Sequence, residues 1–353
     1  MWRGSSRLSG IGHYAPAALA AGVLSLFIAC QALLYWLDKP RHFDAPELVE
    51  LRAGTNLTVF LDDLGERGIL PHPEWLRYYA RLIGVADAVR AGEYLLEPGI
   101  TPRGILQKLI KGEVVLYSVT IIEGTTVRQM LAQLHAQRNL QVLIDPAEPD
   151  ALLQLLGADK ELKSAEGVFF PDTYQFHAGM SDLDILKMSH QRMQQILEEE
   201  WQMRVDNLPY ANSYEALVMA SLVEKETGLA SERPDIAGVF VRRLQRGMLL
   251  QTDPAVIYGV GSEFTGNLTR VHLQTPGPYN TYLNPGLPPS PIALPGRAAI
   301  TAALHPAGGD TLYFVARGDG SHEFSTTLDA HNAAVRKFQI RKRAVNYRSR
   351  PTG

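Results

Sequence analysis

The chain has 353 residues, 46% hydrophobic and 20% charged, and its 34 lysines and arginines against 37 aspartates and glutamates give a net charge of −3. This composition excludes wholesale disorder and a membrane protein with many spans, and it lacks the basic excess of a nucleic-acid binder. Its single cysteine, Cys30, permits neither an intramolecular disulfide nor a cysteine-rich zinc site.

The first distinctive feature is an uncharged run from Tyr14 to Leu37. About 20 apolar residues can cross the hydrocarbon core of a bilayer, and aromatic residues stand near both ends of this run, where they favour the membrane interface. We therefore predict an uncleaved transmembrane helix over 14–37, with residues 1–13 in the cytoplasm and the remainder exported. A cleaved signal peptide, which usually has a shorter apolar region, and a lipid-modified Cys30 are the alternatives.

A quasi-repeat follows a polar, proline-containing linker at 38–46. Three times a glycine turn and an Asn or Thr precede an amphipathic run, which is typical of an N-capped helix; these turns are Gly54-Thr55-Asn56, Gly99-Ile100-Thr101 and Gly124-Thr125-Thr126. Strand-like stretches at 48–51 and 117–122 precede two of these turns. The repetition predicts βα units. The glycine turns and helix caps that such units need are enough to explain the repeated pattern.

The second half of the chain predicts further helices and one hairpin. Residues 138–165 are irregular, with a loop at 145–150, and 250–295 is rich in proline and glycine, which predicts a surface built of turns. The expected helices are 182–201, 214–227, 236–244 and 328–340, the last capped by Thr326, Thr327 or Asp329, and the expected hairpin strands are 311–316 and 322–325. The mixture indicates an α+β fold.

The clearest chemical signal lies at the end of the helix 214–227, which is apolar nearly all round and therefore predicted to be buried. It ends in Glu224-Lys225-Glu226. Apolar surroundings and the negative end of a helix dipole both favour a protonated carboxyl group, which is what a general acid requires. The competing interpretation, favoured by spacing alone, is a solvated helix tip.

Other chemistries have weak support in the sequence. His305, His322 and His331 lack metal-ligand spacing, no nucleophile elbow occurs, and no glycine loop fits a phosphate site. The basic C-terminal stretch indicates a solvated helix end. We predict no metal and no cofactor.

Five ordered motifs carry a resemblance to a known family: EGVFFPDTYQF (166–176), MASLVEKETG (219–228), the segment 230–259, YNTYLNPGLPPSPIALPG (279–296) and LYFVARGDGSHEFSTTLDAHN (312–332). Together they resemble the endolytic murein (peptidoglycan) transglycosylases of the MltG/YceG-like family. An older description of that family as an aminodeoxychorismate lyase would imply pyridoxal phosphate, and no lysine here stands in a context that supports it.

The resemblance implies a function and a location. Family members are single-pass bacterial inner-membrane proteins whose periplasmic domain cleaves the MurNAc–GlcNAc bond within nascent glycan strands, leaves a 1,6-anhydro-MurNAc end and terminates elongation. Implied partners are glycan strands, the inner membrane, penicillin-binding proteins and the elongation or division machinery, and not nucleic acid. The alternative function is a non-catalytic peptidoglycan-binding scaffold for cell-wall synthesis.

The resemblance also implies a division of the chain and an active site. Residues 47–115 resemble a LysM-like wall-binding module, 116–165 connect it to a catalytic domain at 166–345, and 346–353 form a tail. The family's catalytic glutamate falls on Glu226; the reverse assignment, with Glu224 as the acid, is the alternative. Sugar-lining candidates are Glu224, Asp172, Tyr174, Gln251, Thr252, Asp253, Tyr258, Tyr279, Asn280 and Tyr282, although the segments FPDTY and QTDP are equally compatible with purely turn-forming roles.

Overall fold

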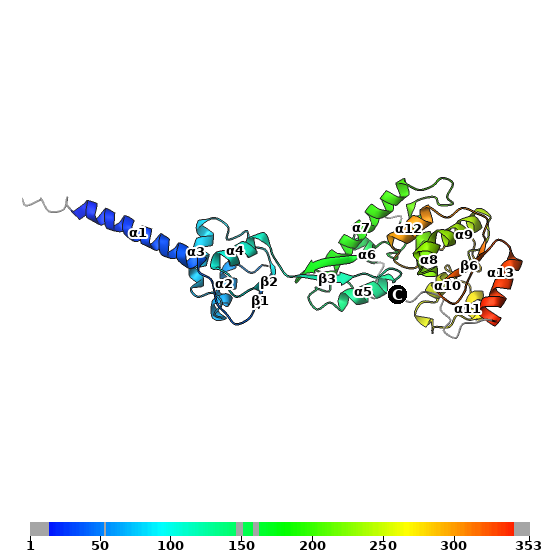
Figure 1. Cartoon of the computed structure of the whole chain (residues 1–353), viewed down its shortest axis with the longest axis horizontal. Coiled ribbons are helices and arrows are strands. Elements are labelled where there is room, and N and C mark those ends of the chain that lie inside the picture. Colours follow the sequence, from blue (N-terminus) through cyan, green and yellow to red (C-terminus); the bar gives the residue numbers. More distant parts are fainter. Residues whose placement is uncertain (1–13, 53, 146–150, 158–161, 342–353) are drawn as a thin grey trace, which may run out of the picture. The chain divides into compact units, whose positions relative to one another are not determined.

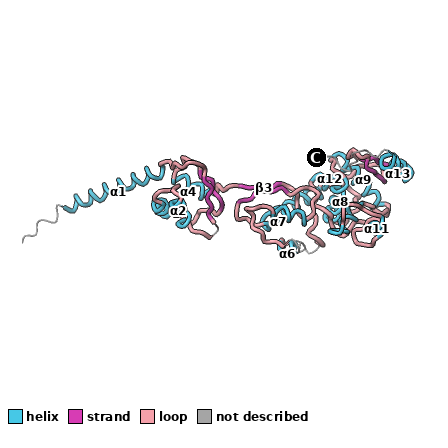
Figure 2. Tube along the Cα trace, turned by 90° about the horizontal axis from the view of Figure 1, so that it is seen from below, coloured by secondary structure: helices cyan, strands magenta, loops and turns pink. Residues whose placement is uncertain are grey.

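The computed structural model describes residues 14–52, 54–145, 151–157 and 162–341. The predicted N-terminal segment 1–13, the tail 346–353 and most of the loop at 145–150 lie outside these ranges. The chain divides into two compact units (Figure 1): unit 1 is Met1–Tyr117 with His177–Gly179, and unit 2 is Ser118–Phe176 with Met180–Gly353. Helices dominate both units, and the strands are short (Figure 2). The mixed α+β class is confirmed.

Unit 1 joins a long apolar helix to a small module. Its elements are α1 (Tyr14–Asp38), β1 (Glu47–Leu51), α2 (Leu57–Glu66), α3 (Pro73–Leu82), β2 (Gly92–Leu96) and α4 (Pro102–Lys111). The β1 strand pairs antiparallel with β2, with Leu51 opposite Gly92. One core formed by the helices and this sheet includes Leu37, from the last turn of α1. The helix predicted over 14–37 is therefore confirmed, whereas α3 has no counterpart among the predicted elements.

The predicted helix caps are confirmed in both units. Asn56 accepts a hydrogen bond from the backbone of Val59, and Thr101 accepts one from Gly104. Thr126 forms a full capping box with Gln129 at the start of α5 (Val127–His135). Each cap stabilises the start of its helix because it accepts hydrogen bonds from backbone N–H groups that have no partner within the helix.

Unit 2 is mostly helical. Besides α5 it contains α6 (Ala151–Leu155), α7 (Asp182–Gln202), α8 (Ser213–Glu226), α9 (Arg233–Gln245), α10 (Asp253–Val260), α11 (Arg270–Gln274), α12 (Arg297–Leu304) and α13 (Leu328–Val335), which continues into the π-helical turn η3 (Arg336–Arg341). The predicted hairpin is confirmed as β5 (Tyr313–Ala316) paired with β6 (His322–Ser325). A further two-stranded sheet pairs β3 (Leu116–Thr120) with β4 (Thr173–His177).

The prediction of turns alone over 250–295 is wrong, because α10 and α11 lie there. Thr252 stands at the N-cap position of α10, and Pro254 occupies its first turn. Proline is tolerated at that position because the first turn of a helix has no acceptor for its missing N–H. A proline-rich composition therefore concealed a helix start.

Helix α8 is the centre of unit 2. Every residue from Ala216 to Glu224 is buried, as its all-round apolar pattern predicts. It packs against α12 and α9 within the unit's main core. Its last turn therefore emerges from the interior at a fixed place, and that turn carries both candidate acids.

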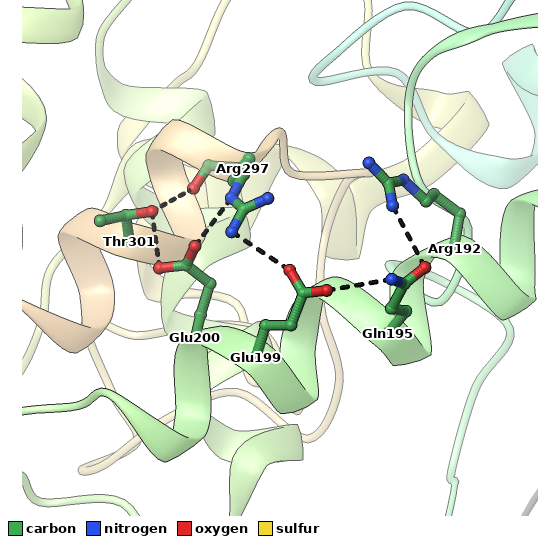
Figure 3. A network of polar contacts seen from close by, with 6 residues as sticks. All are labelled: Arg192, Gln195, Glu199, Glu200, Arg297 and Thr301. Atoms are coloured by element: carbon green, nitrogen blue, oxygen red, sulfur yellow. Dashed lines mark hydrogen bonds and ion pairs between the residues drawn. The ribbon is translucent and has the colours of Figure 1, made fainter.

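A polar network fixes α12 against α7 (Figure 3). Arg297 donates from Nε to Glu200 at 2.8 Å and from Nη2 to Glu199 at 3.2 Å. The hydroxyl of Thr301 also donates to Glu200 at 2.9 Å, and Glu199 accepts from Gln195 at 3.0 Å. Since Glu200 is buried, these donors stabilise a carboxylate that would otherwise oppose the packing of α7.

Candidate active site

Glu226 is the last residue of α8 and is half-buried. Its Oε1 accepts a hydrogen bond from the hydroxyl of Thr252 at 2.5 Å. Thr252 is itself buried and precedes α10, 26 residues along the chain. A short hydrogen bond from a fixed hydroxyl holds the carboxyl group of Glu226 in one orientation.

Thr252 is held by a second loop. Its N–H donates to the hydroxyl of Thr281 at 3.0 Å, and that hydroxyl donates back to the carbonyl of Thr252 at 3.3 Å. The neighbouring Gln251 N–H donates to the carbonyl of Thr281 at 3.1 Å. The segments QTDP and YNTY, which the sequence singled out separately, therefore lie side by side next to Glu226.

Asp253 and Tyr282 extend this arrangement. The phenol of Tyr282 donates to Oδ1 of Asp253 at 2.6 Å. Burial raises the pKa of Tyr282, and the negative charges of Asp253 and, to a lesser degree, Glu226 act in the same direction. Tyr282 therefore stays a neutral hydrogen-bond donor, within electrostatic range of Glu226.

Gln251 has unusual backbone geometry. Its φ is 52°, in the left-handed region that non-glycine residues seldom adopt, and its side chain is exposed. Backbone strain of this kind persists only where the surroundings enforce it, and it clusters at functional sites. Gln251 thus presents an amide to solvent directly beside Thr252.

Arg243 lies within electrostatic range of Glu226, and the sequence did not indicate it as a candidate. Its guanidinium donates to the carbonyls of Leu312 at 2.7 Å and Leu250 at 2.8 Å, inside the unit. Burial lowers the pKa of Arg243, and nearby Tyr313, Tyr282 and Glu226 oppose that effect. An arginine within the apolar stretch IAGVFVRRL could have indicated a buried guanidinium. A position on the solvent-facing side of the helix was the simpler explanation of the same pattern.

Glu224, the alternative acid, has different surroundings. It is 8% exposed, and its Oε1 accepts from Nη2 of Arg233 at 3.0 Å while its Oε2 accepts from the N–H of Gly296 at 3.1 Å. Arg233 also lies 3.5 Å from Glu123. This pairing favours a charged, structural carboxylate at Glu224, and so it supports Glu226 over Glu224 as the acid.

Tyr258 and Tyr279 belong to a neighbouring cluster with Glu166. The two rings meet edge to face at 4.9 Å between centroids, and Tyr279 shares a hydrogen bond with Ser290 at 2.7 Å. The phenol of Tyr258 donates to Glu166 at 3.2 Å, and the N–H of Val127 donates to the same carboxyl group at 2.9 Å.

Glu166 is a second residue that the sequence reading missed, although it opens the motif EGVFFPDTY. Burial raises the pKa of Glu166 to about 7, against the opposing hydrogen bonds from Val127 and Tyr258. It therefore changes charge near neutral pH. Its described contacts join the start of α5 to α10.

Three other candidates make structural contacts. Asn280 is buried, and its Nδ2 donates to the carbonyls of His272, Leu273 and Thr275, which fastens α11. Asp172 is exposed and accepts from the N–H after it, and Tyr174 donates to the carbonyl of Phe170 at 2.7 Å. Their contact with sugar stays a prediction.

Two of the three histidines considered from the sequence, His322 and His331, have protein partners. His322 pairs with Glu232 at 2.8 Å, and the ring of His331 stacks on Tyr313. Within the described ranges, no group of three His, Cys, Asp or Glu side chains could hold a metal ion.

A cavity of about 830 Å³ opens at the other end of α8, lined by Tyr214, Asn212 and the proline-rich segment 285–289 among others. Its lining reaches along α8 as far as Val218, which lies eight residues, about 12 Å, before Glu226. Its walls carry few titratable groups, so size alone does not make it the reactive site. The predicted catalytic residue Glu226 and the segments QTDP and YNTY lie together at the opposite end of α8.

Comparisons with known proteins show which family the chain belongs to. A sequence profile described as the YceG-like family matches residues 49–337. A relative named endolytic murein transglycosylase, from Bacillus subtilis (strain 168), is 31% identical over 307 residues, which cover 82% of this chain and 84% of the relative. A protein of the same name from Streptococcus pneumoniae (strain D39) is 30% identical over 323 residues, which cover 81% of this chain and 57% of that protein.

A solved structure is also similar. It is described as a putative yceG-like protein from Listeria monocytogenes, with a TM-score of 0.54 and 28% sequence identity. The match covers 82% of this chain and 98% of that one.

Proposed function

The chain belongs to the YceG-like family, and from this premise we propose that it is a membrane-anchored endolytic peptidoglycan transglycosylase with Glu226 as its acid and base. The curated relatives support the enzyme class, a lytic transglycosylase that acts on peptidoglycan. The observation that carries the residue assignment is the Glu226 carboxyl group, held by Thr252 at the end of the buried helix α8.

The proposed reaction needs one carboxyl group. Protonated Glu226 gives its proton to the glycosidic oxygen between MurNAc and GlcNAc, and the bond from that oxygen to the anomeric carbon breaks with its electrons on the oxygen. The resulting carboxylate takes the proton of the MurNAc C6 hydroxyl, whose oxygen bonds to the anomeric carbon. The product is a 1,6-anhydro end, no water is consumed, and Glu226 is protonated again.

One carboxyl group is sufficient for a simple physical reason. Most glycosidases need a second carboxylate to act as nucleophile or to activate water. Here the attacking hydroxyl is part of the substrate, so proximity replaces a positioned water. The neighbouring Gln251 amide, which can donate and accept, and the Tyr282 oxygen, which can accept, are suited to hydrogen bonds with a polyhydroxy ring.

We propose the anchor and location on separate grounds. The segment Ala18–Asp38 of α1 is apolar and long enough to cross a membrane, and its most apolar stretch is not buried within the protein. An N-terminus in the cytoplasm would place unit 2 outside it, at the inner membrane where nascent strands emerge. Residues 47–115 are proposed as a LysM-like glycan-binding module, and penicillin-binding proteins and the elongation or division machinery as partners.

The test is digestion of purified glycan strands by the full-length protein reconstituted in lipid. Endolytic cleavage should turn long strands into a broad distribution of intermediate lengths early in the reaction. Release of only terminal disaccharides would contradict the endolytic assignment. Binding without any change in strand length would instead support a non-catalytic scaffold.

A further inference from the structure

Helix α3 carries an exposed apolar face made of Trp75, Tyr78 and Leu82, here called the α3 face. These side chains are 38%, 64% and 79% exposed. Their spacing of three and seven residues places them on one side of the helix, away from the buried Leu76 and Ala80. A contiguous aromatic and aliphatic face on a small module marks an interaction surface.

The α3 face adjoins the end of the proposed membrane span. The ring of Trp75 lies 5.5 Å from that of Trp36, in the last turn of α1. Trp36 is 8% exposed and Leu37 is fully buried, so the final turn of α1 belongs to the core of the module. Figure 1 shows α3 on the side of the module from which α1 leaves.

Polar contacts fix this junction. Arg103 of α4 donates two hydrogen bonds to Asp38, of 2.7 and 3.1 Å, and one to the phenol of Tyr79 at 2.9 Å. Arg41 donates to the carbonyl of Trp36 at 3.0 Å, and its backbone pairs with Ile100 and Gly99. The residues between α1 and β1 are therefore not a loose tether, and α3 is held at the point where α1 leaves the bilayer.

We propose that the α3 face lies in the interface of the bilayer that α1 spans, between the lipid headgroups and the acyl chains. This inference rests on the proposed membrane anchor. Trp and Tyr combine an apolar ring with a polar atom and are enriched at that depth, and Leu82, with the adjacent and exposed Ile83, supplies aliphatic area. The occupant is lipid because the surface continues directly from a helix whose side chains need lipid around them.

The proposal implies a fixed distance between unit 1 and the membrane surface. With α1 and the α3 face both in the membrane, residues 47–115 lie directly on the membrane surface and do not extend away from it. A glycan-binding module held in this way would meet strands close to where they leave the membrane.

Site-directed nitroxide labels on the full chain in lipid nanodiscs test the proposal. Three labels are compared: one on the native Cys30 within α1, and one each on Leu82→Cys and Leu328→Cys in a Cys30→Ser background. Leu328, on α13 of unit 2, is 54% exposed and serves as the matched aqueous control. The readout is label relaxation by oxygen, which concentrates in lipid, relative to relaxation by a water-soluble nickel chelate.

We expect the oxygen-to-nickel ratio at Leu82→Cys to be several-fold higher than at Leu328→Cys and below that at Cys30. A ratio at Leu82→Cys equal to that at Leu328→Cys, with Cys30 in lipid, would overturn the inference and leave the anchor intact. A water-like ratio at Cys30 would overturn the anchor, and the inference with it. A label at Tyr78→Cys, on the same face, should repeat the result for Leu82→Cys.

Discussion

The last turn of α8 places two carboxyl groups in different surroundings. Glu224 lies inside unit 2, where an arginine and a backbone N–H bind its oxygens, whereas Glu226 is half-buried and receives a hydroxyl hydrogen bond from Thr252. A cationic partner holds a carboxylate in its charged form and opposes proton donation. The comparison teaches that two identical side chains, two residues apart, lie in surroundings that fit the different roles proposed for them, stability for Glu224 and chemistry for Glu226.

The substitution Glu226→Gln should have the largest effect, on the rate of strand cleavage. This substitution keeps the acceptor for Thr252 and removes the proton that the reaction needs. Loss of a general acid typically costs about 10²–10⁴ in rate, so we expect a fall of about 10³-fold in strand cleavage. The measurement is the initial rate on purified peptidoglycan, with Glu215→Gln at the other end of α8 as the control; comparable rates for the two variants would contradict the assignment.

Glu224→Gln should show the opposite pattern. It leaves the buried Arg233 without its close carboxylate partner, and breaking a buried ion pair costs about 3–5 kcal/mol. We expect a lower midpoint of chemical denaturation and near-normal activity per folded molecule. If Glu224→Gln were stable but inactive, the roles assigned to the two acids would have to be exchanged.

Glu166 extends the comparison to a third buried carboxyl group. Its pKa of about 7 in the folded protein exceeds its ordinary value of 4.5, so between these values the folded state binds more protons than the unfolded state. Its contribution to stability is therefore complete below about pH 4.5 and is lost as the pH rises through 7. Over this range the loss amounts to about 3 kcal/mol.

Glu166→Gln should remove that part of the pH dependence. The glutamine oxygen can still accept from Val127, and the free energy of unfolding between pH 5 and 8 should fall less steeply than in the parent protein. Denaturation at several pH values provides the measurement. An unchanged slope would show that Glu166 does not titrate in this range.

The smallest effect is expected at Thr252. Thr252→Val keeps the side-chain shape but removes the hydroxyl that orients Glu226, and a hydrogen bond contributes about 0.5–1.5 kcal/mol net, the upper end of which corresponds to a factor of about ten. We expect cleavage to slow by up to about tenfold, with recovery in Thr252→Ser. Equal rates for the Val and Ser variants would show that the 2.5 Å contact does not matter for catalysis.

Local signals made much of the fold predictable. Asn56, Thr101 and Thr126 cap helices through hydrogen bonds to residues three positions away, so neighbouring sequence contains all the information. The burial of α8 likewise follows from its all-round apolar pattern. The start of α10 was concealed because Pro254 is compatible with both a turn and the first turn of a helix.

The site was less predictable because its contacts are distant in sequence. Nothing near Glu224 indicates that Gly296, 72 residues away, donates to it. The inward position of Arg243 depends on carbonyls at Leu250 and at Leu312, which lies 69 residues away, just before β5. Tertiary packing decides which of two similar side chains is buried and paired, and a single sequence does not reveal that.

The most direct test of the central claim is the chemistry of the new glycan ends. Purified strands are digested in water enriched in heavy oxygen, by the parent protein and by Glu226→Gln, and the fragments are weighed by mass spectrometry. If Glu226 drives attack by the substrate's own hydroxyl, the parent products are one water lighter than hydrolysis products and contain no heavy oxygen, and Glu226→Gln yields almost none of them. Reducing ends that contain heavy oxygen, or anhydro ends formed equally well by Glu226→Gln, would contradict the claim.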